Sequence, residues 1–234
     1  MDTVAELQQL AAEKQLPVLA AVEMSTSWKG ELTDTLCYGF DPAKNALQTL
    51  ARDVARRQRE NTREVYENLR RKGISFPSLH ELGALLQKPS AQQPHELVAL
   101  LQKHGYGAGE EISLGEMITD AGFFWATNDI AAVVDAAHRS GAVCLIAHPG
   151  RGGGYTCYDG NLLDELRLDV PIDGFEVYYP AHTSEQIAMY VEYAQKHGLL
   201  TSSGSDSHGP EKKPIKYRAE LSQSLLECVG IQIK

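Results

Sequence analysis

The chain has 234 residues, 43% of them hydrophobic and 23% charged, and a formal net charge of -9. This composition is typical of an ordinary globular chain, and the acidic balance argues against nonspecific coating of nucleic acid, which needs a cationic surface. No apolar stretch approaches the roughly 18 residues of a membrane span, no signal peptide precedes the first helix, and the four cysteines lack disulfide-framework spacing. We therefore expect a cytoplasmic protein that binds neither membranes nor, stably, duplex nucleic acid.

The spacing of apolar residues, together with Gly and Pro, predicts alternating helices and strands. In chain order these are a helix at 4–14, a strand at 17–22, a polar excursion at 25–32, a short strand at 34–40, helices at 43–72, 78–87, 94–104, 113–122 and 129–140, a strand at 142–146, a helix at 161–168, a strand at 173–179, a helix at 183–197, a strand from 199 and a closing helix. Residues 41–125 are mostly helical. We therefore expect one domain over residues 1–234 with a small helical insertion at 41–125.

The long helix at 43–72 carries a cluster of five arginines that could be mistaken for a phosphate-binding patch. Acidic residues are interleaved with these arginines, at helical i,i+3 and i,i+4 spacings. Such pairs favour a solvated helix face, which is the interpretation we adopt.

The strand that begins at residue 199 gives way to the small residues of GSDSHG. Side chains two positions apart on an extended segment point the same way, so Asp206 and His208 could coordinate one cation together. The alternative is a polar loop in which Asp206 accepts backbone hydrogen bonds and His208 is solvated. The neighbouring strands favour the metal-binding interpretation.

Three further strands deliver polar groups at their carboxyl ends. The strand at 17–22 ends at Glu23, the strand at 142–146 ends near His148, and the strand at 173–179 ends near His182. A βα barrel builds its active site at that edge from several strand ends. The pattern therefore predicts one site made of these loops.

Arg151 follows His148 and precedes three consecutive glycines. Such a loop lets the backbone approach an anion while the guanidinium binds it with two hydrogen bonds. The alternative is a flexible loop with a solvated arginine. Given the position of the loop, we expect contact with a phosphate.

Six segments in order carry a family resemblance: VEMST, the arginine-rich helix, PHELVALLQKHGY, AHPGR, DGFEVYYPAHTSEQ and GSDSHG. The chain resembles the PHP (polymerase and histidinol phosphatase) domain, in its small metal-dependent phosphoesterase branch. The resemblance implies an α/β fold, a distorted (β/α)7 TIM-like barrel, with up to three divalent metals. It also implies hydrolysis of a phosphate ester, and it matches His95 to a metal-ligand histidine of the family.

The expected metal ligands are Glu23, His95, His148, Asp206 and His208, and the expected substrate-binding residues are Arg151 and His182. Mixed imidazole and carboxylate donors suit Mn, Zn or Fe better than Ca or Mg. Water activated by the metal would attack the phosphate, so no side-chain nucleophile is required.

The chain departs from the family at its beginning, because the family's HxH and Asp-His segments are absent. We therefore expect a barrel truncated by about two strands, through a misassigned start, a fragment or a degenerate gene. The branch resembled acts on nucleoside 3′,5′-bisphosphates and on the 5′ ends of short RNA, so we expect a small phosphorylated substrate or a short oligonucleotide. The alternatives are a histidinol-phosphatase-like monoesterase and a catalytically inactive remnant.

Overall fold

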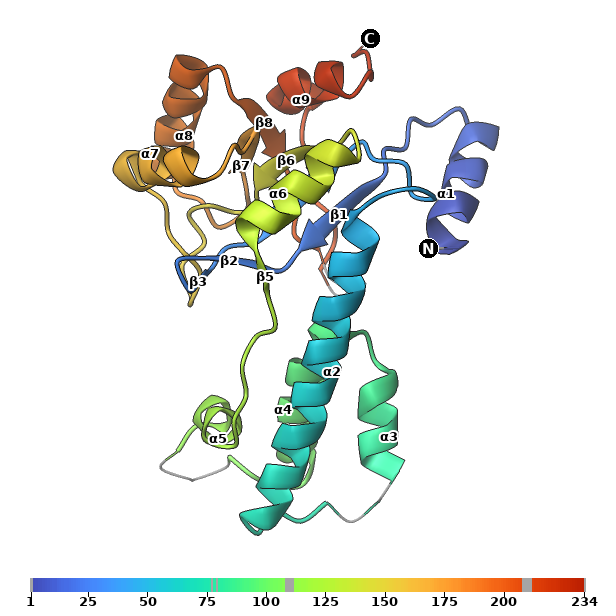
Figure 1. The fold of residues 1–234 in the computed structure, drawn as a ribbon, viewed down its shortest axis with the longest axis vertical. Helices are drawn as coiled ribbons and strands as arrows, with labels where there is room; N and C mark the ends of the chain where they lie inside the picture. The colour runs from blue at the N-terminus through green and yellow to red at the C-terminus, as the bar shows by residue number, and fades with distance from the viewer. Residues whose placement is uncertain (1, 77, 79, 108–111, 208–211, 234) are drawn as a thin grey trace. The chain divides into compact units, whose positions relative to one another are not determined.

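The computed structural model describes residues 2–76, 78, 80–107, 112–207 and 212–233. The chain separates into two compact units (Figure 1). We call residues 1–48 with 127–234 the sheet unit, and residues 49–126 the helical unit. None of the helices in the described ranges is long and apolar enough to cross a membrane.

The sheet unit contains a five-stranded sheet in the order β1-β4-β6-β7-β8. These strands are β1 (Ala21–Met24), β4 (Thr35–Tyr38), β6 (Val143–Ile146), β7 (Gly174–Tyr178) and β8 (Leu200–Ser203). Neighbours β6, β7 and β8 are parallel, whereas β4 runs antiparallel to both β1 and β6. Over the described residues the sheet is open, with β1 and β8 at its edges.

This open sheet differs from the expected (β/α)7 barrel, because β4 reverses the chain direction. Parallel strands need a crossover of a dozen or more residues, but β1 and β4 are joined by a short segment that holds only β2 (Thr26–Trp28) and β3 (Glu31–Leu32). The mixed α/β class is confirmed, and a closed barrel is not formed by the strands that the structure describes.

The expected polar excursion at 25–32 is in fact a hairpin. Lys29 and Gly30 form its turn, both with positive φ (51° and 86°), as a tight two-residue hairpin turn requires. Strand β2 also pairs in parallel with β5 (Asn128–Asp129), which makes a second sheet in the order β3-β2-β5.

Helices flank the main sheet (Figure 1). They are α6 (Ile130–Arg139), α7 (Gly160–Asp169), α8 (Ser184–His197) and α9 (Gln223–Cys228), with the short turn η2 (Ala219–Ser222). Helix α1 (Asp2–Glu13) instead leaves the side chains of Leu7 and Leu10 exposed. The side chains of Asp129 and Thr183 cap α6 and α8, because each accepts a hydrogen bond from a backbone N–H of the first helical turn. Helix α6 packs on β6, and Tyr190 of α8 packs on Phe175 of β7, so the core lies between the sheet and these helices.

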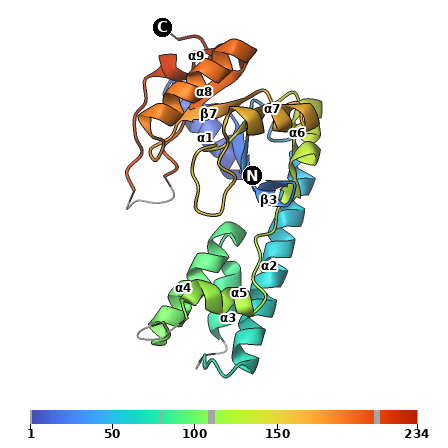
Figure 2. The ribbon, with the colours of Figure 1, turned by 90° about the vertical axis from the view of Figure 1, so that its left-hand side faces the viewer.

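The helical unit contains α2 (Leu47–Arg71), which enters it from the sheet unit, and α3 (His80–Gln87), η1 (Ser90–Gln92), α4 (Gln93–Lys103) and α5 (Leu114–Asp120). Figure 2 shows α3, α4 and α5 beside α2. Their apolar faces share a core of their own around Leu69, Leu97 and Leu101. The solvated face predicted for α2 is confirmed, since exposed Arg56 pairs with Asp53 and Glu60 along the helix.

Candidate metal centre

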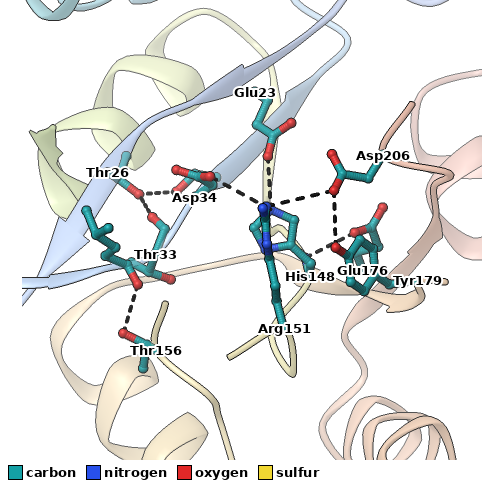
Figure 3. Close-up of polar contacts among 12 residues, drawn as sticks. Glu23, Thr26, Thr33, Asp34, His148, Arg151, Thr156, Glu176, Tyr179 and Asp206 are labelled. Carbon is teal, nitrogen blue, oxygen red and sulfur yellow. Dashed lines mark hydrogen bonds and ion pairs between the residues drawn. The ribbon is translucent and has the colours of Figure 1, made fainter. Parts of the chain in front are cut away.

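Three side chains meet at one edge of the main sheet: Glu23, Asp34 and His148 (Figure 3). Glu23 lies in β1 and His148 follows β6, so both come from carboxyl ends of strands. Asp34 precedes β4, which is antiparallel, and its amino end therefore lies at the same edge. The Ala147 N–H donates to the Asp34 carbonyl at 2.9 Å and joins the two loops.

The potential ligand atoms of these three residues all lie within 4.8 Å of one another. The His148 Nε2 atom is 3.2 Å from Glu23 Oε1 and 3.8 Å from Asp34 Oδ2. His148 is 3% exposed and Asp34 is 8% exposed. The three groups therefore lie close together, with Asp34 and His148 shielded from water and Glu23 exposed to it.

Burial and neighbouring charges shift the pKa values of Asp34 and His148. Burial, reinforced by the Glu23 charge, raises the pKa of Asp34 from 3.8 to about 6. Burial opposes protonation of His148, but its hydrogen bond to Glu23 and the charges of Glu23 and Asp34 prevail and raise its pKa. Two carboxylates in such a site repel each other, and a cation placed between them would relieve the repulsion.

The chemistry of this donor set fits a divalent transition metal. One imidazole nitrogen and two carboxylate oxygens are the mixture that Zn, Mn and Fe accept, and Ca and Mg prefer all-oxygen sites. Glu23, Asp34 and His148 can each turn a ligand atom toward a shared point. We therefore regard these three residues as the candidate metal-binding core of the site.

Asp34 is fixed by threonines on either side of it. The Thr26 hydroxyl donates to the Thr33 carbonyl and contacts the Thr35 hydroxyl at 2.9 Å. Tyr158 donates from its own hydroxyl to Thr33 Oγ1 at 2.9 Å. These buried contacts hold the backbone that carries Asp34 and keep its carboxylate at the edge of the sheet.

Two residues of the site have unfavourable backbone conformations. The φ angles of His148 and Asp206 are 29° and 44°, a region that residues other than glycine rarely adopt. The Glu176 carboxylate supports the first, because it accepts the His148 N–H at 3.0 Å. Burial raises the pKa of Glu176 from 4.5 to about 7. Strain of this kind is typical of functional sites that the surrounding fold holds in place.

Arg151 extends along the His148 ring into this group (Figure 3). Its guanidinium stacks over the Tyr155 ring at 4.6 Å. Its Nη1 atom is 3.5 Å from His148 Nε2 and 3.8 Å from Asp206 Oδ2. Asp206 also accepts a hydrogen bond from the Tyr179 hydroxyl at 3.1 Å. The positively charged guanidinium of Arg151 therefore lies close to the His148 imidazole and to the Asp206 carboxylate.

A comparison with models of known protein families finds no match for this chain. Two curated relatives match most of its length. The 3′,5′-nucleoside bisphosphate phosphatase of Chromobacterium violaceum is 28% identical over 218 residues, which span 88% of this chain and 73% of the relative. The 5′-3′ exoribonuclease of Haemophilus influenzae is 25% identical over 221 residues, which span 89% of this chain and 77% of the relative.

Two solved structures share the fold. An amidohydrolase from Chromobacterium violaceum, with bound sulfate and no metal, has a TM-score of 0.72 at 23% identity and covers 96% of this chain and 81% of its own. A metal-dependent phosphoesterase from Bifidobacterium adolescentis has a TM-score of 0.73 at 20% identity and covers 98% of this chain and 82% of its own. The chain has a phosphoesterase- or amidohydrolase-like fold.

Within this fold, the predicted site residues are distributed unevenly. Glu23 and His148 meet directly, and Asp206 reaches them through Arg151. His208 lies outside the described residues. His95 lies in the helical unit, on α4, where its ring packs against Trp125 at 5.9 Å.

His182 has a different task from the predicted phosphate contact. Its Nδ1–H donates to the Val177 carbonyl at 2.8 Å, and its Nε2 accepts the Gly150 N–H at 3.1 Å. Both ring nitrogens are therefore used inside the protein, and His182 is 9% exposed. With Gln186, whose side-chain amide donates to the Gly150 carbonyl at 3.1 Å, it holds the loop that carries His148 and Arg151.

Sequence reasoning missed Asp34 and Glu176. Asp34 stands before a strand, and the expectation of parallel strands directed attention only to residues after strands. Glu176 lies inside β7 and is 5% exposed, in an otherwise apolar segment. A carboxylate within a buried strand was the available signal, because such a group is costly unless it has a partner.

Proposed function

We propose that this chain is a PHP-type metal-dependent phosphoesterase that hydrolyses a phosphate ester of a nucleotide-like substrate. The proposed substrate is either a nucleoside 3′,5′-bisphosphate or the 5′ end of a short RNA. The observation that carries the proposal is the Glu23–Asp34–His148 group, with Arg151 beside it. The names of the two curated relatives support the substrate class. In this proposal the helical unit is an insertion within one PHP-type domain.

Glu23, Asp34 and His148 would hold a divalent ion such as Mn, Zn or Fe. When bound, such an ion supplies Lewis acidity and lowers the pKa of a coordinated water. Asp206 lies on the other side of Arg151 and is a further candidate ligand. His95 and His208 remain predicted ligands on the strength of the family resemblance.

The other residues prepare the site for an anionic substrate. Arg151 offers a planar set of N–H donors that suits two phosphate oxygens at once. Tyr155 stacks on the guanidinium, and the Tyr179 hydroxyl restrains Asp206. Glu176 and His182 hold the 148–151 loop by accepting the backbone N–H groups of His148 and Gly150. Charge and shape are therefore set before the substrate arrives, which is how hydrolysis of a charged ester is assisted.

The test is phosphate release from adenosine 3′,5′-bisphosphate by the purified chain supplied with Mn²⁺. We expect Asp34→Asn and His148→Ala to lower kcat/KM by more than about tenfold, because each removes a proposed ligand. The matched control is Asp135→Asn, which changes an exposed carboxylate paired with Arg139 on α6 and should leave kcat/KM unchanged. Mn²⁺ binding without phosphate release from any bisphosphate, short RNA or histidinol phosphate would indicate a non-catalytic metal-binding protein.

A further inference from the structure

The guanidinium of Arg151 lies against the same atom that would bind a metal ion. His148 Nε2 faces Glu23 Oε1 at 3.2 Å and Asp34 Oδ2 at 3.8 Å, and Arg151 Nη1 approaches it at 3.5 Å. A ring nitrogen carries either a proton or a lone pair, so it cannot donate to Glu23 and accept from Arg151 at once. A metal ion would use that same lone pair. Arg151 and a metal ion therefore have conflicting demands on one atom.

The surroundings define this position of Arg151. Tyr155 provides the stacking surface for the guanidinium, and the Tyr155 ring also packs edge-on against the His148 ring at 5.3 Å. Asp206 faces the other side at 3.8 Å. The Arg151 side chain is nevertheless 36% exposed, so its charged end can turn toward solvent without unpacking the core.

Electrostatics sharpen the conflict. Arg151 partly neutralises the carboxylates of the cluster, and a divalent ion would gain its affinity from the same negative charge. A phosphate group, in contrast, would attract the guanidinium and offer it paired oxygens. Phosphate and metal ion thus make opposite demands on Arg151.

We propose that Arg151 is a built-in competitor of the metal ion, and that a phosphate group relieves this competition by drawing the guanidinium away. This inference rests on the proposed function. It means that metal and phosphate bind with positive coupling, and coupling of this kind is reciprocal. Competition by Arg151 would therefore favour metal binding at the site when a phosphorylated substrate is also bound.

The first experiment measures Mn²⁺ binding by titration calorimetry on the full chain after chelator treatment and dialysis. We expect Arg151→Gln to bind Mn²⁺ about tenfold more tightly than the wild type, because an opposing positive charge has been removed. The matched control is Arg139→Gln, which removes an exposed arginine paired with Asp135 and should change the Kd by less than about twofold. Arg151→Lys keeps the charge and should stay near the wild-type Kd. If Arg151→Gln fails to fold, Arg151→Met, which also removes the charge, replaces it with the same expected tightening.

The second experiment repeats the titrations in inorganic phosphate. We expect phosphate to tighten Mn²⁺ binding more in the wild type than in Arg151→Gln, because only the wild type has a competitor to remove. Equal or weaker Mn²⁺ binding by Arg151→Gln, or equal coupling in both proteins, would overturn the inference and leave the proposed function standing. Absence of Mn²⁺ binding in every variant would instead overturn the proposed function together with this inference.

Discussion

Individual residues of the candidate site are held in states that cost free energy. Asp34 and Glu176 are buried carboxyl groups with raised pKa values, and His148 and Asp206 have positive φ angles. Each of these features is unfavourable for folding alone. Their concentration at one sheet edge is typical of a site that was shaped for binding or chemistry.

Asp34 offers the most direct test of the metal centre at this scale. We expect Asp34→Asn to weaken Mn²⁺ binding by about 10–100-fold, because an amide oxygen is a neutral and weaker ligand than a carboxylate. Titration calorimetry measures the change, with Asp135→Asn as the control for loss of an exposed carboxylate. An unchanged Kd would remove Asp34 from the metal-binding core.

Glu176 predicts an unusual dependence of stability on pH. Its pKa is raised by burial from 4.5 to about 7, so between these values the native state holds a proton that the unfolded state has lost. The free energy of unfolding should therefore fall as the pH rises from 4.5 to 7, by on the order of 2–3 kcal/mol from this group. The raised pKa of Asp34 also makes the free energy of unfolding fall with rising pH, so the contribution of Glu176 is found by comparing the wild type with a Glu176 variant.

Glu176→Gln removes this titration and keeps an oxygen that can accept the His148 N–H. We expect urea unfolding in chelator to show a smaller decline between pH 4.5 and 7 for Glu176→Gln than for the wild type. Glu192→Gln, on the exposed face of α8, should retain the wild-type dependence. The same decline in Glu176→Gln as in the wild type would assign the effect to other groups.

At the scale of elements, the direction of β4 decides which residues meet. Strand β4 is antiparallel to β6, with Thr35 opposite Ile146, so the start of β4 lies beside the end of β6. Strand β7 and helix α8 then support the 148–151 loop through Glu176, His182 and Gln186. The site is thus positioned by rigid elements and not by its loops alone.

Close packing between β7 and the segment after β8 gives an element-scale prediction. A Cβ atom at Gly204 would lie 2.1 Å from Glu176 Oε1, and Glu176 is buried and already hydrogen-bonded. We expect Gly204→Ala to destabilise the protein by about 1–3 kcal/mol through overpacking and to weaken Mn²⁺ binding.

Gly83→Ala is the matched control for this change. Gly83 lies inside α3 with no atom within 4 Å of the added Cβ, so alanine should stabilise the protein by about 0.5–1 kcal/mol. Thermal denaturation and calorimetry measure both variants. Equal stability of Gly204→Ala and the wild type would show that Glu176 can move without cost.

At the scale of the whole molecule, the chain consists of two units with separate cores. Glu23, Asp34 and His148 all belong to the sheet unit, and Leu101 is fully buried in the core of the helical unit. Because of this division, we expect the stability of the helical unit to be separable from the candidate metal-binding core. It also offers a way to ask whether His95 contributes to binding.

We expect Leu101→Ala to lower the free energy of unfolding by about 2–5 kcal/mol, because it leaves a cavity in a packed core. The Mn²⁺ affinity of the folded protein should stay within about twofold, since the three core ligands are in the other unit. Leu168→Ala, at a position 88% exposed, should change stability by less than about 0.5 kcal/mol. A tenfold or larger loss of Mn²⁺ affinity in Leu101→Ala would indicate that the helical unit supplies part of the metal site.

The sequence by itself determined the elements and the chemistry at the ends of several strands. Apolar periodicity is a local property, so it located most helices and strands, and the spacing of opposite charges predicted the solvated face of α2. The positions of Glu23 and His148 at the ends of predicted strands also identified them as site residues, and in the structure His148 Nε2 lies 3.2 Å from Glu23 Oε1. These features depend on neighbours along the chain.

Only the tertiary structure decided the direction of β4, and with it the membership of Asp34 in the site. Strand pairing is a choice between distant segments, and hydrophobic periodicity is the same for parallel and antiparallel partners. The roles of Glu176 and His182 follow from the same cause, because their partners are backbone groups 28 and 32 residues away. Local sequence identifies a group that can form a hydrogen bond, but the packing of distant segments determines which group it meets.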